Sequence, residues 1–139
     1  MKRLVIDIDD TLCRTTDGEY HDSEVVEPIR DRLLSYREAG FEIVLYTSRN
    51  VRTFGNNVGK INAKTLPTLF VWLDKHEIPY DEIHVGKPWC GFDGFYVDDK
   101  AVRPDEFATL DFPEIKELLR SAGERMQAHA QSQRVKDIP

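Results

Sequence analysis

Residues 4–11 read Leu-Val-Ile-Asp-Ile-Asp-Asp-Thr, and this stretch decides the fold. Its apolar run predicts a short strand over residues 4–8, of the kind that is covered on both faces in a parallel sheet. Three carboxylates, those of Asp7, Asp9 and Asp10, fall within four positions at the end of that run. Because neighbouring carboxylates repel one another and resist desolvation, the cluster indicates cation binding or catalysis.

The rest of the chain alternates strand and helix. Apolar runs predict further strands over residues 41–46, 83–85 and 94–97. The first helix is expected to begin at Pro28 and to stop at Gly40. The second and third are expected to follow N-caps at Thr65, with Pro67 in the first turn, and at Asp111, and the segment 49–64 is expected to be a loop. Their apolar stripes are Ile29, Leu33 and Tyr36, then Leu66, Leu69, Phe70 and Leu73, and last Ile115, Leu118, Leu119 and Ala122. This alternation predicts an α/β fold with a parallel sheet.

Length and charge limit the classes of protein. A chain of 139 residues fits one domain with its own core, here taken as residues 1–122, and a polar tail over 123–139 that is either a frayed end or a contact for a second subunit. Nineteen basic against twenty-five acidic residues give a net charge of −6, which disfavours a nucleic-acid binder.

Targeting signals and cysteine usage point to a compartment. We find no signal peptide and no apolar run long enough to cross a bilayer, so no membrane partner is expected. The two cysteines, Cys13 and Cys90, form neither a disulfide framework nor a zinc pattern. We therefore expect a cytoplasmic protein.

Reactive residue types follow all four predicted strands. In parallel sheets, functional residues lie at the carboxyl ends of strands. The residues found there are Asp7 and Asp9, Thr47 and Ser48, Lys87, and Asp98 and Asp99. Their joint occurrence is more specific than any one of them.

These residue types suit phosphate-ester chemistry. Asp7 could attack phosphorus and form an aspartyl-phosphate, while Asp9 could protonate the leaving oxygen and then activate water. Asp98 could join Asp7 in holding Mg²⁺, a hard cation that prefers oxygen ligands. Lys87 would offset negative charge, and the Thr47 hydroxyl could hold a phosphoryl oxygen, with Ser48 a weaker candidate.

The four motifs together resemble the haloacid dehalogenase (HAD) superfamily. Residues 7–11 resemble its DxDx[TV] signature, Thr47 its second motif, Lys87 its third and Asp98-Asp99 its fourth. The resemblance covers roughly residues 3–110. Longer stretches, over residues 47–50, 58–62, 85–91 and 95–100, are similar to small HAD proteins of capsular polysaccharide biosynthesis.

That resemblance implies a Rossmann-like three-layer α/β/α sandwich with strand order 5-4-1-2-3. The strands ending in Asp7 and Asp98 would then be neighbours, and Mg²⁺ would be held by both carboxylates and by the backbone carbonyl of Asp9. Asp99 would orient Lys87 or a metal-bound water. Asp10 is expected to have a structural role, in which it helps Thr11 to hold the turn.

The chain departs from many HAD enzymes because it has no room for a large cap domain. Residues 13–27 fit only a flap, expected as a hairpin turning near Asp17-Gly18. The site should therefore be open or closed by another subunit, so a homo-oligomer is possible. Arg49 and Asn50 are candidate substrate contacts, although a salt bridge within the loop is an equal alternative for them.

Three functions fit these observations. The first is a Mg²⁺-dependent phosphomonoesterase acting on a sugar phosphate or related metabolite of polysaccharide assembly. The second is a phosphotransferase or mutase that uses the same phosphoenzyme. The third is a non-catalytic metal-binding subunit of a glycan-assembly complex.

Overall fold

The computed structural model describes residues 1–14 and 20–132. The chain divides into two compact units, Met1–Gly94 and Phe95–Pro139, which are taken separately below. No helix within the described ranges is both long and apolar enough to cross a membrane.

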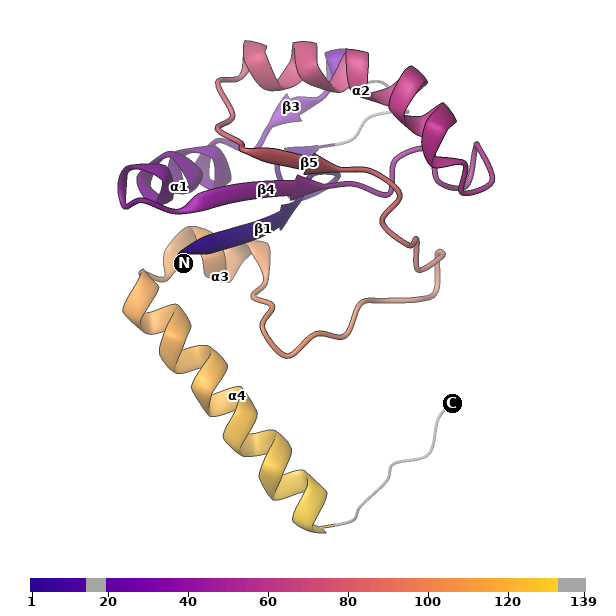
Figure 1. The fold of residues 1–139 in the computed structure, drawn as a ribbon. Coiled ribbons are helices and arrows are strands. Elements are labelled where there is room, and N and C mark those ends of the chain that lie inside the picture. The colour runs from indigo at the N-terminus through magenta and orange to yellow at the C-terminus, as the bar shows by residue number, and fades with distance from the viewer. Residues whose placement is uncertain (15–19, 133–139) are drawn as a thin grey trace. The chain divides into compact units, whose positions relative to one another are not determined.

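The first unit is built on a parallel sheet of three strands. These are β1 (Arg3–Asp7), β4 (Glu42–Tyr46) and β5 (Glu82–His84), in the order β1-β4-β5. Figure 1 shows the three strands side by side and pointing the same way. The predicted α/β fold with a parallel sheet is therefore confirmed. The five-strand order 5-4-1-2-3 goes beyond these three strands and is not shown by them.

Two helices of the first unit add buried side chains to its core. Helix α1 (Glu27–Glu38) packs against β4, and it buries the predicted residues Ile29, Leu33 and Tyr36. Pro28 lies in its first turn, and Gly40, at φ +87°, follows its end as predicted. Helix α2 (Val58–Lys75) packs against the short helix η1 (Tyr20–Asp22).

Helix α2 begins earlier than the sequence predicted. Its N-cap is Asn57, whose side chain accepts a hydrogen bond from the Lys60 N–H at 3.1 Å, so residues 58–64 are helix rather than loop. Thr65 lies inside the helix, and its hydroxyl donates to Asn50 Oδ1 at 2.7 Å instead of capping. Pro67, an unusual residue for a helix interior, was misread as a first-turn residue.

The predicted apolar stripe of α2 is partly wrong as well. Leu69 and Leu73 are buried, but Phe70 is 40% exposed and Leu66 is half-buried. Ile61 and Trp72 are buried in addition, and together with Thr65, Leu69 and Leu73 they follow the three- and four-residue spacing of one helix face.

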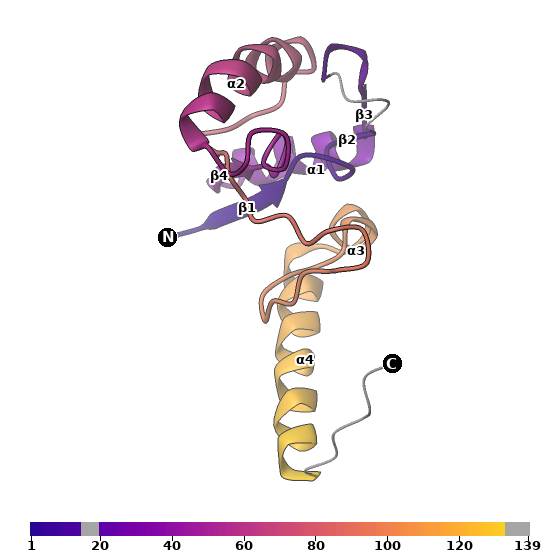
Figure 2. The same ribbon diagram turned by 90° about the vertical axis from the view of Figure 1, so that its right-hand side faces the viewer.

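The predicted flap is a two-stranded hairpin. Strands β2 (Cys13–Arg14) and β3 (Glu24–Val25) pair antiparallel, with Cys13 opposite Val25, and lie together in Figure 2. The predicted turn near Asp17-Gly18 lies outside the described residues. Trp72 Nε1 donates to the Ser23 carbonyl at 2.9 Å, which ties this hairpin to α2.

The predicted strand over residues 94–97 is wrong. This segment has no regular secondary structure, and Phe95 and Val97 are 79% and 86% exposed. A strand of this kind needs a neighbouring strand and cover for its apolar side chains. Turn-forming residues on both sides, Asp93-Gly94 and Asp98-Asp99, also leave it shorter than most strands.

The second unit is helical. It contains α3 (Pro104–Thr109), which the sequence patterns missed, and α4 (Phe112–Ser132). Asp111 caps α4 as predicted, since its Oδ1 accepts from the Glu114 N–H at 2.9 Å and the Glu114 carboxylate accepts from the Asp111 N–H at 3.0 Å. Ile115 is buried, while Leu118, Leu119 and Ala122 are half-buried. The boundary predicted after residue 122 falls within α4, and residues 133–139 lie outside the described ranges.

Candidate active site

The acidic cluster lies in a tight turn after β1. The carbonyl of Ile8 accepts hydrogen bonds from the N–H groups of Thr11, Leu12 and Cys13, at 3.2, 2.9 and 3.3 Å. Asp10 has φ +60°, a left-handed conformation that Asp tolerates better than most residues. Asp10 is exposed, whereas Asp7 and Asp9 are half-buried. The turn thus separates two sheltered carboxylates from one that faces solvent.

Asp7 is paired with a lysine from the end of β5. Lys87 Nζ lies 3.2 Å from Asp7 Oδ1, and the Thr11 hydroxyl donates to Asp7 Oδ2 at 3.1 Å. Burial raises the pKa of Asp7 above its usual value, and the nearby Lys87 and Thr11 only partly offset this effect. Lys87 therefore lies next to Asp7, where its positive charge favours the ionised carboxylate.

Lys87 is positioned by the strand ends around it. Its backbone N–H donates to the Thr47 carbonyl at 3.1 Å, and its ammonium lies 4.3 Å from the centre of the Tyr46 ring. Only 11% of the Lys87 side chain is exposed. Gly86, at φ +78°, lets the chain turn just before Lys87. A Cβ added at Gly86 would lie 3.2 Å from Val58 Cγ2.

Asp9 is held by residues from the end of β4. Arg49 Nε and Nη2 lie 3.1 and 2.9 Å from Asp9 Oδ1, and the Thr47 hydroxyl donates to Asp9 Oδ2 at 2.5 Å. Burial lowers the pKa of Arg49, but Asp9 and Tyr20 together outweigh burial, so the Arg49 pKa is raised. The salt bridge of Arg49 is to Asp9 and not within the loop, and it does not test the predicted role of Arg49 in substrate binding.

The sequence reasoning missed Tyr20, which joins this group from the flap. Its hydroxyl lies 3.2 Å from both Asp9 Oδ2 and Thr47 Oγ1, and the Arg49 guanidinium lies 4.3 Å from the centre of its ring. Tyr20 is 3% exposed, and burial together with Asp9 raises its pKa well above the usual value. The one sequence feature that could have indicated Tyr20 was an aromatic residue within the predicted flap, residues 13–27.

The other two residues predicted near β4 serve the loop. Asn50, at φ +63°, accepts from the Thr65 hydroxyl and anchors the loop to α2. Ser48 is half-buried, and its carbonyl accepts from the Val51 N–H at 3.1 Å. Neither contact tests the predicted role in substrate or phosphate binding.

Asp98 and Asp99 belong to the second unit. Asp98 Oδ1 accepts from the Lys100 N–H at 2.8 Å, which closes a local turn. Within residues 1–14 and 20–132, no group of three or more His, Cys, Asp or Glu side chains is placed to share a metal ion. The shared Mg²⁺ of Asp7 and Asp98 therefore stays a prediction.

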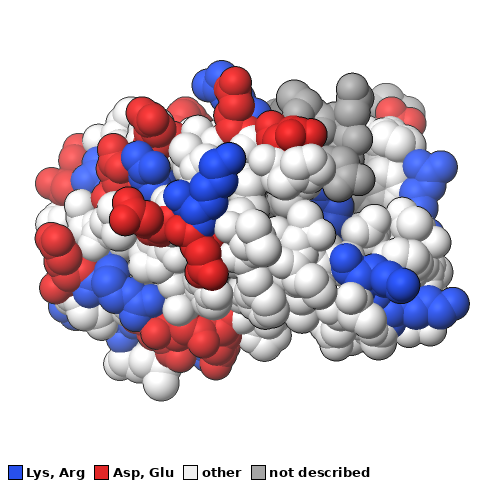
Figure 3. Space-filling model, turned by 90° about the horizontal axis from the view of Figure 1, so that it is seen from above, with Lys and Arg blue, Asp and Glu red and all other residues white. Residues whose placement is uncertain are grey.

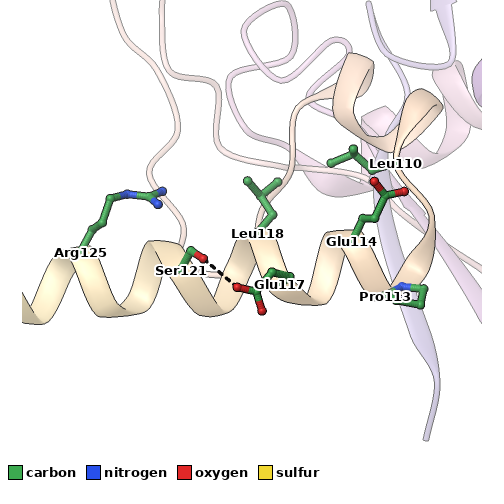
Figure 4. A pocket seen from close by; sticks show the side chains of 7 residues that line it. All are labelled: Leu110, Pro113, Glu114, Glu117, Leu118, Ser121 and Arg125. Atoms are coloured by element: carbon green, nitrogen blue, oxygen red, sulfur yellow. Dashed lines mark hydrogen bonds between the residues drawn. The ribbon is translucent and has the colours of Figure 1, made fainter.

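A separate surface hollow lies on the second unit and contains none of the predicted site residues. Figure 4 shows its lining along α4, where the Ser121 hydroxyl donates to Glu117 at 3.2 Å. The lining residues are Leu110, Pro113, Glu114, Glu117, Leu118, Ser121 and Arg125. This hollow contains no reactive residues from the ends of strands. The candidate active site is therefore the group around Asp7 and Asp9.

Comparison with known proteins identifies one relative. No protein-family model and no curated protein matches the chain. A crystal structure of an MCSG target from Vibrio cholerae is similar to it, with 51% sequence identity and a TM-score of 0.85. The match covers 87% of this chain and 98% of the Vibrio cholerae chain. The chain therefore belongs to the same protein family as that Vibrio cholerae protein.

Proposed function

We propose that this protein is a Mg²⁺-dependent phosphomonoesterase of the HAD superfamily that works through an aspartyl-phosphate. The observation that carries this proposal is the pairing of Asp7 with Lys87, after two strands that end at the same edge of the sheet, beside a second carboxylate, Asp9. A phosphate monoester is negatively charged, so its hydrolysis needs a nucleophile, positive charge and a proton donor in one place.

In the proposed reaction, an Asp7 oxygen attacks phosphorus and the bond from phosphorus to the leaving oxygen breaks. Asp9 gives its proton to that oxygen, so the leaving group departs as an alcohol. Water then attacks phosphorus, Asp9 takes the proton from the water, and inorganic phosphate and the free Asp7 carboxylate result. Lys87 favours the ionised, nucleophilic form of Asp7 against the effect of burial.

The donor atoms around Asp7 suit Mg²⁺. Asp7 offers a half-buried carboxylate, and among the described residues no backbone N–H donates to the Asp9 carbonyl oxygen. These are hard oxygen ligands, and Mg²⁺ commonly keeps several waters beside one or two carboxylates. Bound there with Asp98, the ion would neutralise phosphate charge.

The proposed substrate is a sugar phosphate or related metabolite of polysaccharide assembly, in the cytoplasm. Its support is the resemblance to capsule-biosynthesis HAD proteins and the length of residues 13–27, which fits a flap but no large cap domain. Figure 3 shows acidic and basic side chains intermixed over the left part of the drawn face. The net charge of −6 supports a small substrate over a nucleic acid.

The test is hydrolysis of a panel of phosphate esters with Mg²⁺, covering sugar phosphates, nucleotides and glycerol phosphates. Asp7→Asn should abolish turnover by at least about 10³-fold, because it removes the nucleophile. Asp10→Asn is the matched control, since it makes the same chemical change in an exposed neighbour and Asn also tolerates positive φ. A chelator should abolish turnover reversibly.

Two results would contradict this function. Hydrolysis by Asp7→Asn at the rate of Asp10→Asn would remove Asp7 as the nucleophile. No hydrolysis of any ester by the unsubstituted protein would leave a metal-binding, non-catalytic role. A new phosphate ester formed in the presence of an acceptor sugar would instead identify a phosphotransferase.

A further inference from the structure

We propose that Tyr20 is a positioning residue that ties the flap to the general acid Asp9. This inference rests on the proposed phosphatase function, but it concerns a residue outside the four motifs. Tyr20 opens the short helix η1, within the β2–β3 hairpin, and points its hydroxyl at Asp9 and Thr47.

The protons available in this group can be counted. The Thr47 hydroxyl has one proton, and the 2.5 Å contact assigns it to Asp9 Oδ2. Toward Tyr20, Thr47 can then only accept. The Thr47 oxygen already accepts from the Arg49 N–H at 3.0 Å, and the Tyr20 hydroxyl donates its single proton to Asp9 Oδ2 at 3.2 Å. Two hydroxyl donors on Oδ2 thus hold the Asp9 carboxylate in one orientation.

The ring of Tyr20 connects the flap to α2 and to the loop after β4. It lies 6.5 Å from the Trp72 ring in a tilted arrangement, and the Arg49 guanidinium lies over it at 4.3 Å. Trp72 also binds the Ser23 carbonyl. Tyr20 is 3% exposed and Thr47 is fully buried, so Tyr20→Phe removes a buried proton donor from beside the half-buried Asp9 carboxylate.

This arrangement predicts an effect that depends on the leaving group. An alkoxide needs a proton from Asp9 as it departs, whereas p-nitrophenolate leaves without one. A residue that orients Asp9 should therefore matter for glycerol phosphate and much less for p-nitrophenyl phosphate. A residue that only supports packing should affect both substrates equally.

The experiment compares kcat/KM for these two esters in Tyr20→Phe, which removes the hydroxyl and keeps the ring. We expect a loss of about tenfold or more for glycerol phosphate and less than about threefold for p-nitrophenyl phosphate. Asp9→Asn should show the same pattern more strongly. The matched control is Tyr36→Phe, another buried tyrosine, packed on Phe41 at the amino end of β4. Equal losses on both esters, or no loss on either, would overturn the proposal.

A double-mutant cycle separates this inference from the function itself. The fall in Tm caused by Tyr20→Phe should be smaller in an Asp9→Asn background, because the two groups interact directly. If the Tm shifts of the two substitutions were additive, Tyr20 would not interact directly with Asp9, and the proposal would be overturned even in an active enzyme. If the unsubstituted protein hydrolysed neither ester, the phosphatase function and the role of Tyr20 in acid catalysis would both be wrong, and non-additive Tm shifts would then support the tether alone.

Discussion

The Lys87 ammonium lies 3.2 Å from Asp7 Oδ1, although 80 residues separate the two in the chain. Parallel strands produce this contact, because β1 and β5 flank β4 and end at the same edge of the sheet. Burial raises the pKa of Asp7 although Lys87 lowers it, so the ionised form of Asp7 is disfavoured in the folded protein. A carboxylate with a pKa shifted in this way is typical of functional sites.

Asp7→Asn should raise the Tm at neutral pH while it removes activity. The folded-state pKa of Asp7 is raised, so the stability it contributes is full at low pH and is lost as the pH rises through that pKa. Above it, the wild-type protein carries a buried charge that Asn lacks. The gap in Tm between Asp7→Asn and wild type should therefore shrink toward pH 4, as measured by thermal unfolding. A lower Tm for Asp7→Asn at pH 7 would contradict the direction of this pKa shift.

Lys87→Gln should lower kcat/KM by about 10²-fold, because it removes one preorganised positive charge from the phosphate site. It should also move the acid limb of the pH–rate profile to higher pH, since Lys87 lowers the pKa of Asp7. Lys75→Gln, in the last turn of α2, is the control and should leave both quantities unchanged. An unchanged acid limb in Lys87→Gln would mean that the pair does not control Asp7.

Gly86→Ala should destabilise the protein by about 1–3 kcal/mol, because a Cβ at φ +78° is strained and would meet Val58 at 3.2 Å. Gly123→Ala is the opposite case. It lies inside α4, with nothing within 4 Å of the added Cβ, and should stabilise by about 0.5–1 kcal/mol. Denaturant unfolding would measure both. Equal shifts of the same sign would contradict this account of Gly86.

Asn57→Ala should lower the free energy of unfolding by about 1 kcal/mol, through loss of the α2 cap to the Lys60 N–H. Asn57→Asp keeps an acceptor at the same place and should preserve stability. If both variants unfold at the wild-type denaturant midpoint, Asn57 does not define the start of α2.

Local signals explain what the sequence could predict about the fold. The strand β1 and the helix α1 were found from a short apolar run, from Pro28 and from Gly40, all of which act within a few residues. The start of α2 was missed because Pro67 resembled a first-turn residue, while the real cap, Asn57, lies ten positions earlier. The strand over residues 94–97 failed because apolar composition does not guarantee a neighbouring strand.

The candidate site divides in the same way. Asp7, Asp9, Thr47 and Lys87 follow strand ends, so the topology rule found them. Tyr20 follows no such rule, since its partners Asp9 and Thr47 are 11 and 27 residues away and only the folded flap brings them together. The contact of Arg49 with Asp9 was likewise not predictable from the sequence, because the two residues are 40 positions apart.

The most direct test of the central claim is to locate the covalent phosphoryl group. Asp9→Asn should form the intermediate from p-nitrophenyl phosphate and Mg²⁺ but hydrolyse it slowly, because no base activates the water. Acid quenching, borohydride reduction and peptide mass spectrometry would then report homoserine in place of Asp7. Homoserine at position 7 in Asp9→Asn, and its absence in the Asp7→Asn, Asp9→Asn double variant, is the predicted result. Turnover with the phosphoryl group on another residue, or on none, would contradict the account.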